Sequence, residues 1–404
     1  MLTMPGLATR DAENRESHVD VMYFEGPGDV VESFQAWQKG SDVNSQTSRT
    51  FSGHFLDFCK SEGLRARVYS HYERRRTLAE EGFWVETRPS NYSGNGWRHR
   101  LDKLYRGLFI LFAALRYRPD DLHVTSGVTY WVLLAPLRLF GIRIVAHMHN
   151  ALWPQGFPPT QFSARLKRRL DAWFFRHVAH AALCVSPTLE QQIRQISGPG
   201  VCQLQQFRAQ FNPGDFVDFA PAPAQEARPF RVLFAGRVES AKGVFDLLTI
   251  AETLRSEGVV FDICGSGASL TELRQEVANR GLDDVVLVHG RLNRPELLEL
   301  YKNCHAVVVP TRSDFCEGLP LACIEAVLIG RPQITSRLSN ALDVLRGAIL
   351  EAEPNQPDSY AAAIRRLLNE PDTYRALVEA CESLAKPFLH GRLDLQRALH
   401  QLGK

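Results

Sequence analysis

Short apolar runs alternate along the chain with stretches in which apolar residues recur every three or four positions. In the first half, runs rich in Val and Ile predict strands at residues 19–24, 65–70, 122–126, 142–147 and 181–186. Between them, residues 51–61 and 165–180 have a helical period. Strands that alternate with helices indicate parallel βαβ units and a doubly wound sheet.

The same alternation returns in the second half. Strands are predicted at residues 231–235, 259–264, 285–288, 306–309 and 333–335, and helices at 245–257, 270–280, 295–303, 321–328 and 359–368. Residues 212–229 are polar, contain prolines and lack a period, which indicates a linker. We therefore predict an α/β fold of two Rossmann-like doubly wound domains that face a cleft, since such sheets bind ligands at the carboxyl ends of their strands.

These patterns divide the chain into four parts. Residues 1–18 are polar and predict a loose tail, residues 19–215 an N-terminal domain, residues 216–385 a C-terminal domain, and residues 386–404 a C-terminal helix that returns to the first domain. Within the first domain, residues 32–50 read as a long polar insertion after the first strand.

Composition narrows the class of protein. The 404 residues are 45% hydrophobic and 23% charged, which is typical of a soluble globular chain. The eight cysteines are scattered without a Cys-x-x-Cys pair, as expected of free thiols in a reducing compartment. The longest clean apolar run of the first half, residues 108–115, is far shorter than the ~20 residues of a spanning helix. With no apolar run at the N-terminus, a cytoplasmic protein is predicted.

Charge differs between the halves. Residues 1–215 carry 26 Lys and Arg against 20 Asp and Glu, whereas residues 216–404 carry 21 against 25. A basic first half favours an anionic contact, such as a membrane surface or a phosphorylated acceptor, although ordinary surface variation explains it equally well. The near-neutral total and the absence of a recognition motif argue against nucleic acid binding.

A glycine-rich loop follows the first strand of the second half. In the segment Phe-Ala-Gly-Arg-Val-Glu-Ser-Ala-Lys-Gly, Gly236 permits a turn, and Arg237 and Lys242 project from one short loop. Two cations at the carboxyl end of a strand can bind a diphosphate. A second turn ends at Gly267, but position 270 is Leu, so the Gly-x-Gly-x-x-Gly fingerprint of dinucleotide binding is incomplete.

A third loop carries two carboxylates. Pro320 suits the first turn of a helix, where Gly318 and Leu319 would present backbone N–H groups to an anion. Glu317 precedes this helix and Glu325 lies on it. Two carboxylates beside an anion site suggest binding of neutral hydroxyl groups, such as those of a sugar and a ribose.

These loops resemble those of the retaining family 4 glycosyltransferases of the GT-B fold. The Glu-x7-Glu motif at Glu317 and Glu325, the Gly-Arg…Lys-Gly loop and the His-Gly-Arg strand end at Arg291 occur in that family's order and spacing. The resemblance implies that Glu325 holds the ribose, Glu317 the donor sugar, and Arg237 and Lys242 the diphosphate. It also implies base recognition around Gly267 and Arg291.

The resemblance is weaker in the first half. The family's strand-end histidine corresponds to His149, with His147 as the alternative, and its acceptor-side glycine loop falls near Gly53. The polar residues 32–50 depart from the family pattern, and so do residues 336–340, where many relatives carry a glycine pair.

The predicted function is transfer of a sugar from a nucleoside-diphosphate sugar to an acceptor hydroxyl, with retention at the anomeric carbon. No acidic cluster suggests a metal, so neither an obligatory cation nor a cofactor is expected. A GT-B sugar-nucleotide epimerase and a non-catalytic binding subunit remain as alternatives. Basic and aromatic residues at 97–106 and 165–176 suit either an anionic membrane surface or core helices with solvated basic faces.

Overall fold

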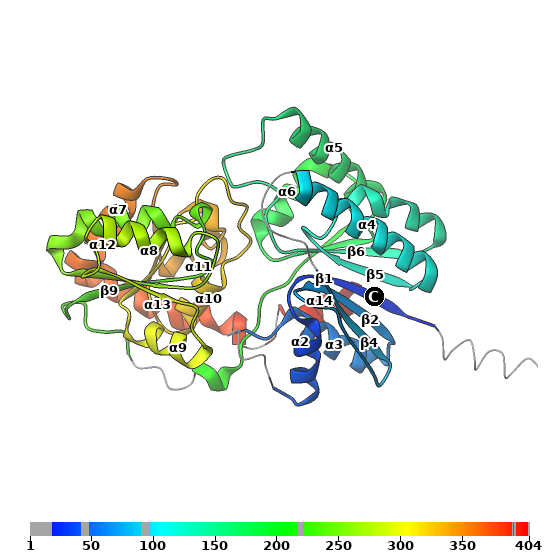
Figure 1. The fold of residues 1–404 in the computed structure, drawn as a ribbon, viewed down its shortest axis with the longest axis horizontal. Helices are drawn as coiled ribbons and strands as arrows, with labels where there is room; N and C mark the ends of the chain where they lie inside the picture. Colours follow the sequence, from blue (N-terminus) through cyan, green and yellow to red (C-terminus); the bar gives the residue numbers. More distant parts are fainter. Residues whose placement is uncertain are drawn as a thin grey trace, which may run out of the picture.

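The protein folds into two α/β units that lie side by side (Figure 1). This computed structural model describes residues 18–41, 48–89, 97–216, 221–389, 391 and 393–402. Each unit is built on one sheet of mainly parallel strands flanked by helices. The predicted pair of Rossmann-like domains is therefore confirmed. Except for His18, the predicted tail lies outside the described residues.

The N-terminal sheet has eight strands in the order β3-β4-β2-β1-β5-β6-β7-β8. Its strands are β1 (Val21–Pro27), β2 (Ala66–Tyr72), β3 (Arg76–Glu80), β4 (Phe83–Pro89), β5 (Asp121–Thr125), β6 (Arg143–Met148), β7 (Ala181–Cys184) and β8 (Gln203–Gln206). Its helices are α2 (Val30–Gln38), α3 (Phe51–Glu62), α4 (Trp97–Tyr117), α5 (Phe162–His177) and α6 (Pro187–Ser197), with 3-10 helices η1 (Trp131–Phe140) and η2 (Pro213–Phe216). All its pairs are parallel except β3 with β4, which form an antiparallel edge.

The predicted polar insertion at residues 32–50 is partly wrong, because α2 occupies its beginning. Asp29 caps this helix, and its carboxylate accepts hydrogen bonds from the N–H groups of Val31 and Glu32. Val30, Val31 and Phe34 are buried in the core. A helix of nine residues offers too few turns for its apolar face to stand out in the sequence. Residues 42–47 of the same stretch lie outside the described residues.

The C-terminal sheet has six parallel strands in the order β11-β10-β9-β12-β13-β14. They are β9 (Phe230–Ala235), β10 (Val259–Cys264), β11 (Val286–Gly290), β12 (Ala306–Val309), β13 (Gln333–Thr335) and β14 (Ile349–Glu351). The helices are α7 (Val244–Leu254), α8 (Leu270–Asn279), α9 (Arg294–Asn303), α10 (Leu321–Leu328), α11 (Leu342–Leu345), α12 (Pro357–Asn369) and α13 (Pro371–Leu389), with short 3-10 helices η3 (Ser240–Lys242), η4 (Arg255–Glu257), η5 (Arg337–Ser339) and η6 (Arg346–Ala348). The carboxyl ends of β9 and β12 lead into the glycine-rich loop and the Glu-x7-Glu loop, so the sheet brings these loops together.

The chain returns to the N-terminal domain at its end, as the sequence predicts. After α13, the last helix α14 (Leu395–Leu402) packs against α3, and its Leu395, Ala398 and Leu399 join the N-terminal core. The two segments that cross between the domains are hydrogen bonded to each other, since Phe211 N–H donates to Phe388 O at 2.9 Å. The two crossing segments thus tie the domains together.

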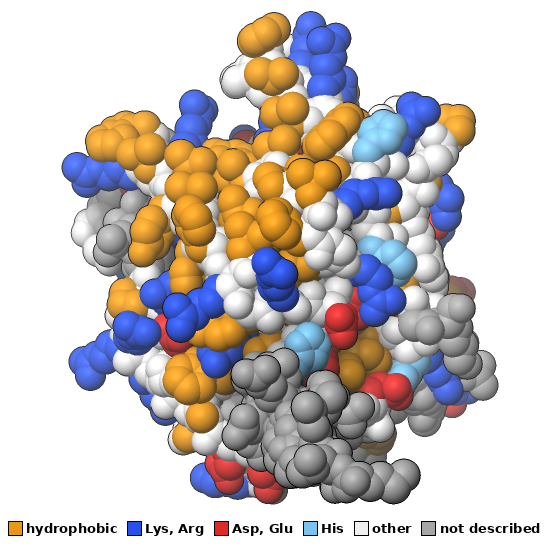
Figure 2. Space-filling view, turned by 90° about the vertical axis from the view of Figure 1, so that its right-hand side faces the viewer, with side chains coloured by type: hydrophobic (Ala, Val, Ile, Leu, Met, Phe, Trp, Pro, Cys, Tyr) orange, Lys and Arg blue, Asp and Glu red, His pale blue; other side chains and the backbone are white. Residues whose placement is uncertain are grey.

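One face of the N-terminal domain exposes large hydrophobic side chains. Figure 2 shows them gathered over its upper part, where Figure 1 places α4 and α5, with Lys and Arg at the margins. No helix in the described part of the chain is both long and apolar enough to cross a bilayer.

Candidate active site

A cavity of about 320 Å³ lies where the two domains meet. The N-terminal domain contributes residues of α3, of the segment after β6 and of the segment after β8, whereas the C-terminal domain contributes the loops after β9 and β12 and the start of α10. Among the sequence-predicted site residues, those that line the cavity are His149, Gly236, Lys242, Glu317, Gly318 and Leu319. The carboxyl ends of both sheets therefore meet at one site, as expected for doubly wound folds.

Lys242 and Glu317 form an ion pair inside this cavity. Their side chains are 14% and 9% exposed, so the pair is largely shielded from water. Thr311 donates a second hydrogen bond to the same carboxylate oxygen at 3.0 Å. The site thus holds one positive and one negative group in contact, where a ligand could use both.

The start of α10 faces the same cavity. Its first intrahelical bond runs from Cys323 N–H to Pro320 O, so the N–H groups of Leu321 and Ala322 point out of the helix end. Both of these residues line the cavity. Pro320 is the N-cap residue, not part of the first turn as the sequence suggested. The N–H groups that point out of the helix therefore lie three residues further along the chain than the predicted Gly318 and Leu319, and their partial positive charge adds to that of Lys242.

Glu325 lies on α10 and is held by a residue that the sequence did not suggest. It is 5% exposed, and the hydroxyl of the fully buried Tyr301, on α9, donates a hydrogen bond to it. Burial, together with the charge of Glu325, raises the pKa of Tyr301 well above its usual value. Tyr301 is therefore a neutral donor that orients the Glu325 carboxylate.

Arg237 is more solvent-exposed than Lys242. Its side chain is 57% exposed and pairs with Glu239 at 3.0 Å. The guanidinium of Arg237 and the ammonium of Lys242 both lie over the ring of Phe315, at 5.1 and 4.3 Å from its centroid. Phe315 thus holds the two cations of the loop near each other.

The other two predicted donor-side residues lie next to strand ends. Gly267 follows β10, and a Cβ atom there would be 2.3 Å from the backbone oxygen of Val238. Only glycine therefore lets the loops after β9 and β10 pack this closely. Arg291 directly follows β11 and has an exposed side chain. The roles of both in base recognition stay predictions.

His149 is the first-domain histidine at the cavity. Its backbone N–H donates a hydrogen bond to Ser126 Oγ at 3.0 Å. Its ring packs against the rings of Phe51 and Phe207, whose centroids lie 4.7 and 5.3 Å from its own. Burial lowers its pKa to about 4, so the imidazole is neutral near pH 7. A neutral imidazole can accept or donate a hydrogen bond without adding charge.

His147 and Gly53 lie elsewhere. His147, on β6, is fully buried, with its Nε2 atom 2.9 Å from Nδ1 of His123. Burial, and the neighbouring His123 and His149, place its pKa well below the usual value. Gly53, in the first turn of α3, lines a separate open hollow of about 780 Å³ between α2 and α3. Of the two histidines, the geometry favours His149.

Two residues that the sequence analysis did not assign to the site complete it. Arg208 lines the cavity from the first domain with its guanidinium bonded to Val185 O at 2.5 Å, and burial lowers its pKa to about 10. Asn340 has a left-handed backbone with φ 56°, and its amide donates to the backbone oxygens of Glu317 and Gly318 at 2.9 and 2.8 Å. Asparagine tolerates this conformation better than most residues, so it can take the place of a glycine there.

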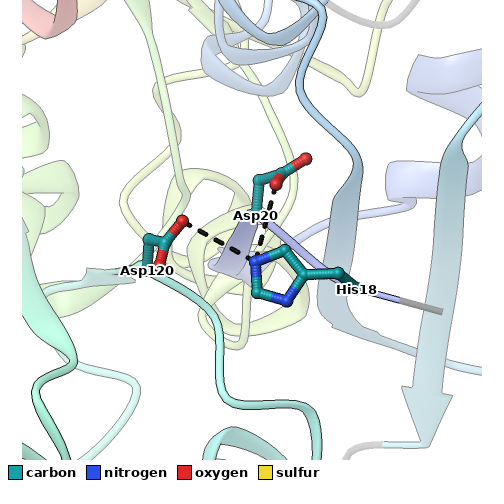
Figure 3. A group of neighbouring side chains, drawn as sticks. All are labelled: His18, Asp20 and Asp120. Atoms are coloured by element: carbon teal, nitrogen blue, oxygen red, sulfur yellow. Dashed lines mark ion pairs between the residues drawn. The ribbon is translucent and has the colours of Figure 1, made fainter. Parts of the chain in front are cut away.

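Within the described residues, one group could bring three metal-ligating atoms together. His18 lies 3.7 Å from a carboxylate oxygen of both Asp20 and Asp120 (Figure 3). These residues lie at the amino ends of β1 and β5, whereas the cavity lies at the carboxyl ends of the strands. They therefore take no part in the site described above.

The two α/β domains and the cavity between them define a protein of the GT-B fold class. The sequence profile described as "Glycosyl transferases group 1" matches residues 218–383, and that described as "Glycosyl transferase 4-like domain" matches residues 56–201. The chain belongs to this family, the family 4 glycosyltransferases.

Two relatives are similar in sequence to part of this chain, and their names differ. The chain is 24% identical to the glycogen synthase of Mycobacterium tuberculosis over 269 residues, which cover 63% of this chain and 61% of that protein. It is 29% identical to the D-inositol 3-phosphate glycosyltransferase of an Arthrobacter species over 278 residues, covering 60% and 62%. The matches thus span less than two thirds of either relative.

Solved structures share the whole fold. The sucrose-phosphate synthase of Thermosynechococcus elongatus superposes with a TM-score of 0.67 at 17% identity, covering 96% of this chain and 98% of that one. HepE of Anabaena in complex with UDP-glucose gives a TM-score of 0.61, also at 17% identity and with the same coverage of both chains. At sequence identities this low, these superpositions establish a common fold.

Proposed function

We propose that this protein transfers a sugar from a nucleoside-diphosphate sugar to an acceptor hydroxyl, with retention at the anomeric carbon. The observation that carries the proposal is the contact between Lys242 and Glu317 beside the start of α10, inside the cavity between the domains. A nucleotide sugar carries negative charge at its diphosphate and neutral hydroxyls on its sugar. The two halves of this ion pair match those two parts.

The leaving group in such a reaction is the nucleoside diphosphate. As its bond to the anomeric carbon breaks, negative charge grows on the departing phosphate oxygen. Lys242 and the N–H groups at the start of α10 are already aimed into the cavity, so they stabilise that charge without rearranging. Arg237 adds a cation at the more exposed side of the loop. These groups provide the positive charge that the reaction needs, and we propose that it proceeds without a metal ion.

The two glutamates bind different parts of the donor. Glu325, fixed by Tyr301, would accept hydrogen bonds from the ribose hydroxyls. Glu317 would accept them from the transferred sugar, which becomes more positive as the leaving group departs. His149 would contact the same sugar as a neutral imidazole from the opposite domain. We propose retention because the loops that carry these residues resemble those of the retaining family 4 glycosyltransferases.

UDP is the nucleotide with which we would test the donor first, since HepE, a structural relative, is described in complex with UDP-glucose. The acceptor would enter from the N-terminal domain. We propose a glycan, a lipid-linked glycan or a small glycoconjugate as acceptor, and a cytoplasmic enzyme that works at the inner face of a membrane.

The test is nucleotide binding followed by transfer. UDP, GDP and ADP are compared for their effect on the melting temperature, because a ligand that binds only the folded state raises it. The matching nucleotide sugar is then incubated alone and with candidate acceptors. We expect slow hydrolysis at most without acceptor. Conversion of the donor to its epimer would instead indicate an epimerase, and binding without any turnover across acceptors would indicate a binding subunit.

A further inference from the structure

Helix α4 carries an apolar stripe that faces away from the protein core. Its inner face, with Ile110, Ala113 and Ala114, is buried against the domain. The exposed large side chains are three or four positions apart on the other face, at Trp97, Leu101, Leu104, Tyr105, Leu108 and Phe112. Phe112 is 66% exposed. A helix apolar on both faces is unusual at a protein–water boundary, because its outer stripe gains nothing from burial in the core.

Helix α5 repeats this arrangement beside α4. Its exposed large side chains follow the same helical spacing at Phe162, Leu166, Leu170 and Trp173. Phe162 is 81% exposed. Between the two helices, η1 contacts both and ends in the exposed Leu139 and Phe140. We call the exposed stripes of α4 and α5, with the end of η1, the apolar face; hydrophobic side chains are gathered there in Figure 2.

The net charge of the helices that carry the apolar face is positive. Helices α4 and α5 each contain five Lys or Arg and one acidic residue. The two acidic residues, Asp102 and Asp171, are paired with Arg106 and Lys167 on their own helices. The excess of positive charge lies beside aromatic and aliphatic side chains, a combination that suits the headgroups and upper acyl region of an anionic bilayer.

A chain segment connects the apolar face to the active site. The segment from His149 to α5 begins at the cavity, where Ala151 N–H donates to Glu317 O at 3.0 Å. Midway, Gly156 lies against the Arg337 guanidinium of the C-terminal domain. The guanidinium of Arg168, on α5, lies 5.7 Å from the ring centroid of Trp153 in the same segment. A bilayer that binds α5 would therefore lie close to the first-domain side of the cavity.

We propose that the apolar face of α4, α5 and η1 docks on an anionic lipid bilayer and presents the first-domain mouth of the cavity to an acceptor in that bilayer. The acceptor part of this inference rests on the proposed function, whereas the docking part does not. Lateral attachment is the mode the helices allow, since no described helix can cross a bilayer. A second copy of this chain fits less well, because two such basic faces would repel each other.

Vesicle binding tests the docking. The intact protein is sedimented with phosphatidylcholine vesicles that either contain or lack phosphatidylglycerol, at low and at raised salt. We expect binding to the anionic vesicles only, with release as salt screens the charges. The variant Arg165→Gln/Arg169→Gln should bind roughly thirtyfold more weakly, from the loss of two charges near the surface. Its matched control, Arg346→Gln/Arg375→Gln, removes two exposed arginines of the C-terminal domain and should bind like the parent.

The apolar contribution is tested with Phe112→Ser/Phe162→Ser, which should weaken vesicle binding while leaving the melting temperature unchanged, because both rings are exposed. Equal recovery on neutral and anionic vesicles would overturn the proposal. So would a self-associated parent that these serine variants turn into monomers without any vesicle binding. Binding of UDP, GDP and ADP is measured on every variant in parallel. Vesicle binding without nucleotide binding would leave the docking standing and refute the proposed function instead.

Discussion

Gly318 lies directly against the backbone carbonyl oxygen of His149, and a Cβ atom at position 318 would be 1.8 Å from that oxygen. The two residues belong to different domains. The start of α10 therefore meets the end of β6 at a distance that only glycine permits.

The contact predicts the effect of Gly318→Ala. The added methyl group has to push the His149 segment away, because its neighbour is backbone and cannot turn aside. Such overpacking costs about 1–3 kcal/mol. We expect turnover to fall sharply while UDP binding to the C-terminal domain changes little. Calorimetry and steady-state kinetics on the same preparation check this. Turnover equal to that of the parent would show that this contact between the domains is not needed.

Lys242 and Arg237 should contribute unequally to diphosphate binding. Lys242 is shielded and faces the cavity, whereas Arg237 is mostly exposed and paired with Glu239. Lys242→Ala should weaken UDP binding by about 1.5–3 kcal/mol, the range for a hydrogen bond to a charged group. Arg237→Ala should weaken it by less, because solvent screens an exposed charge. Calorimetry measures both, with Arg255→Ala as the control, since that exposed arginine pairs with Asp284 outside the cavity. If Lys242→Ala bound UDP like the control, the loop would not be part of the donor site.

Three buried parallel strands were predicted with the bounds that the structure shows, although the buried strand β4 was missed. Strands β10, β12 and β13 begin and end where the apolar runs do, because a strand covered on both faces is nearly continuous in Val, Ile and similar residues. Strand β3 was missed for the opposite reason. It is an edge strand with four of its five residues exposed, so no face of it needs an apolar pattern.

The site was predictable where a motif is local and was missed where it depends on tertiary structure. Glu317 and Glu325 stand in one short segment with a recognisable spacing. Tyr301 supports Glu325 from another helix, 24 positions away, and nothing in its neighbourhood marks it. Asn340 occupies a position where the sequence seemed only to lack glycine, and its left-handed backbone explains the substitution.

The lowered pKa of His149 predicts a dependence of stability on pH. Burial lowers this pKa from 6.5 to about 4. Between these values the unfolded chain binds a proton at His149 that the native state does not, so the free energy of unfolding decreases as pH falls from 6.5 to 4. Above pH 6.5 the contribution is constant. The slope of the unfolding free energy against pH is proportional to the number of protons taken up on unfolding. His149→Asn should reduce that number by up to one in this window, as measured by urea unfolding at several pH values. An unchanged slope would mean that the native imidazole is protonated as readily as the unfolded one.

The last prediction separates the two glutamates. Glu325→Gln should weaken free UDP and the full donor alike, by about 1.5–3 kcal/mol, because both contain the ribose. Tyr301→Phe should weaken both in the same proportion but by only about 1 kcal/mol, since it acts through Glu325. Glu317→Gln should leave the affinity for free UDP nearly intact, because UDP lacks the sugar and Lys242 is then released to the phosphates. Its turnover should nevertheless fall, since its contact strengthens as the sugar gains charge.

Melting temperatures come first in this series, because an unfolded variant would mimic either loss. Both glutamine replacements conserve size, so α10 should keep its packing. Calorimetry with UDP and with the intact donor, followed by turnover, then assigns each carboxylate. A folded Glu317→Gln variant that lost free UDP as badly as Glu325→Gln would show that Glu317 binds the nucleotide itself. In that case the sugar would have to be held from the opposite domain, where His149 and Arg208 line the same cavity.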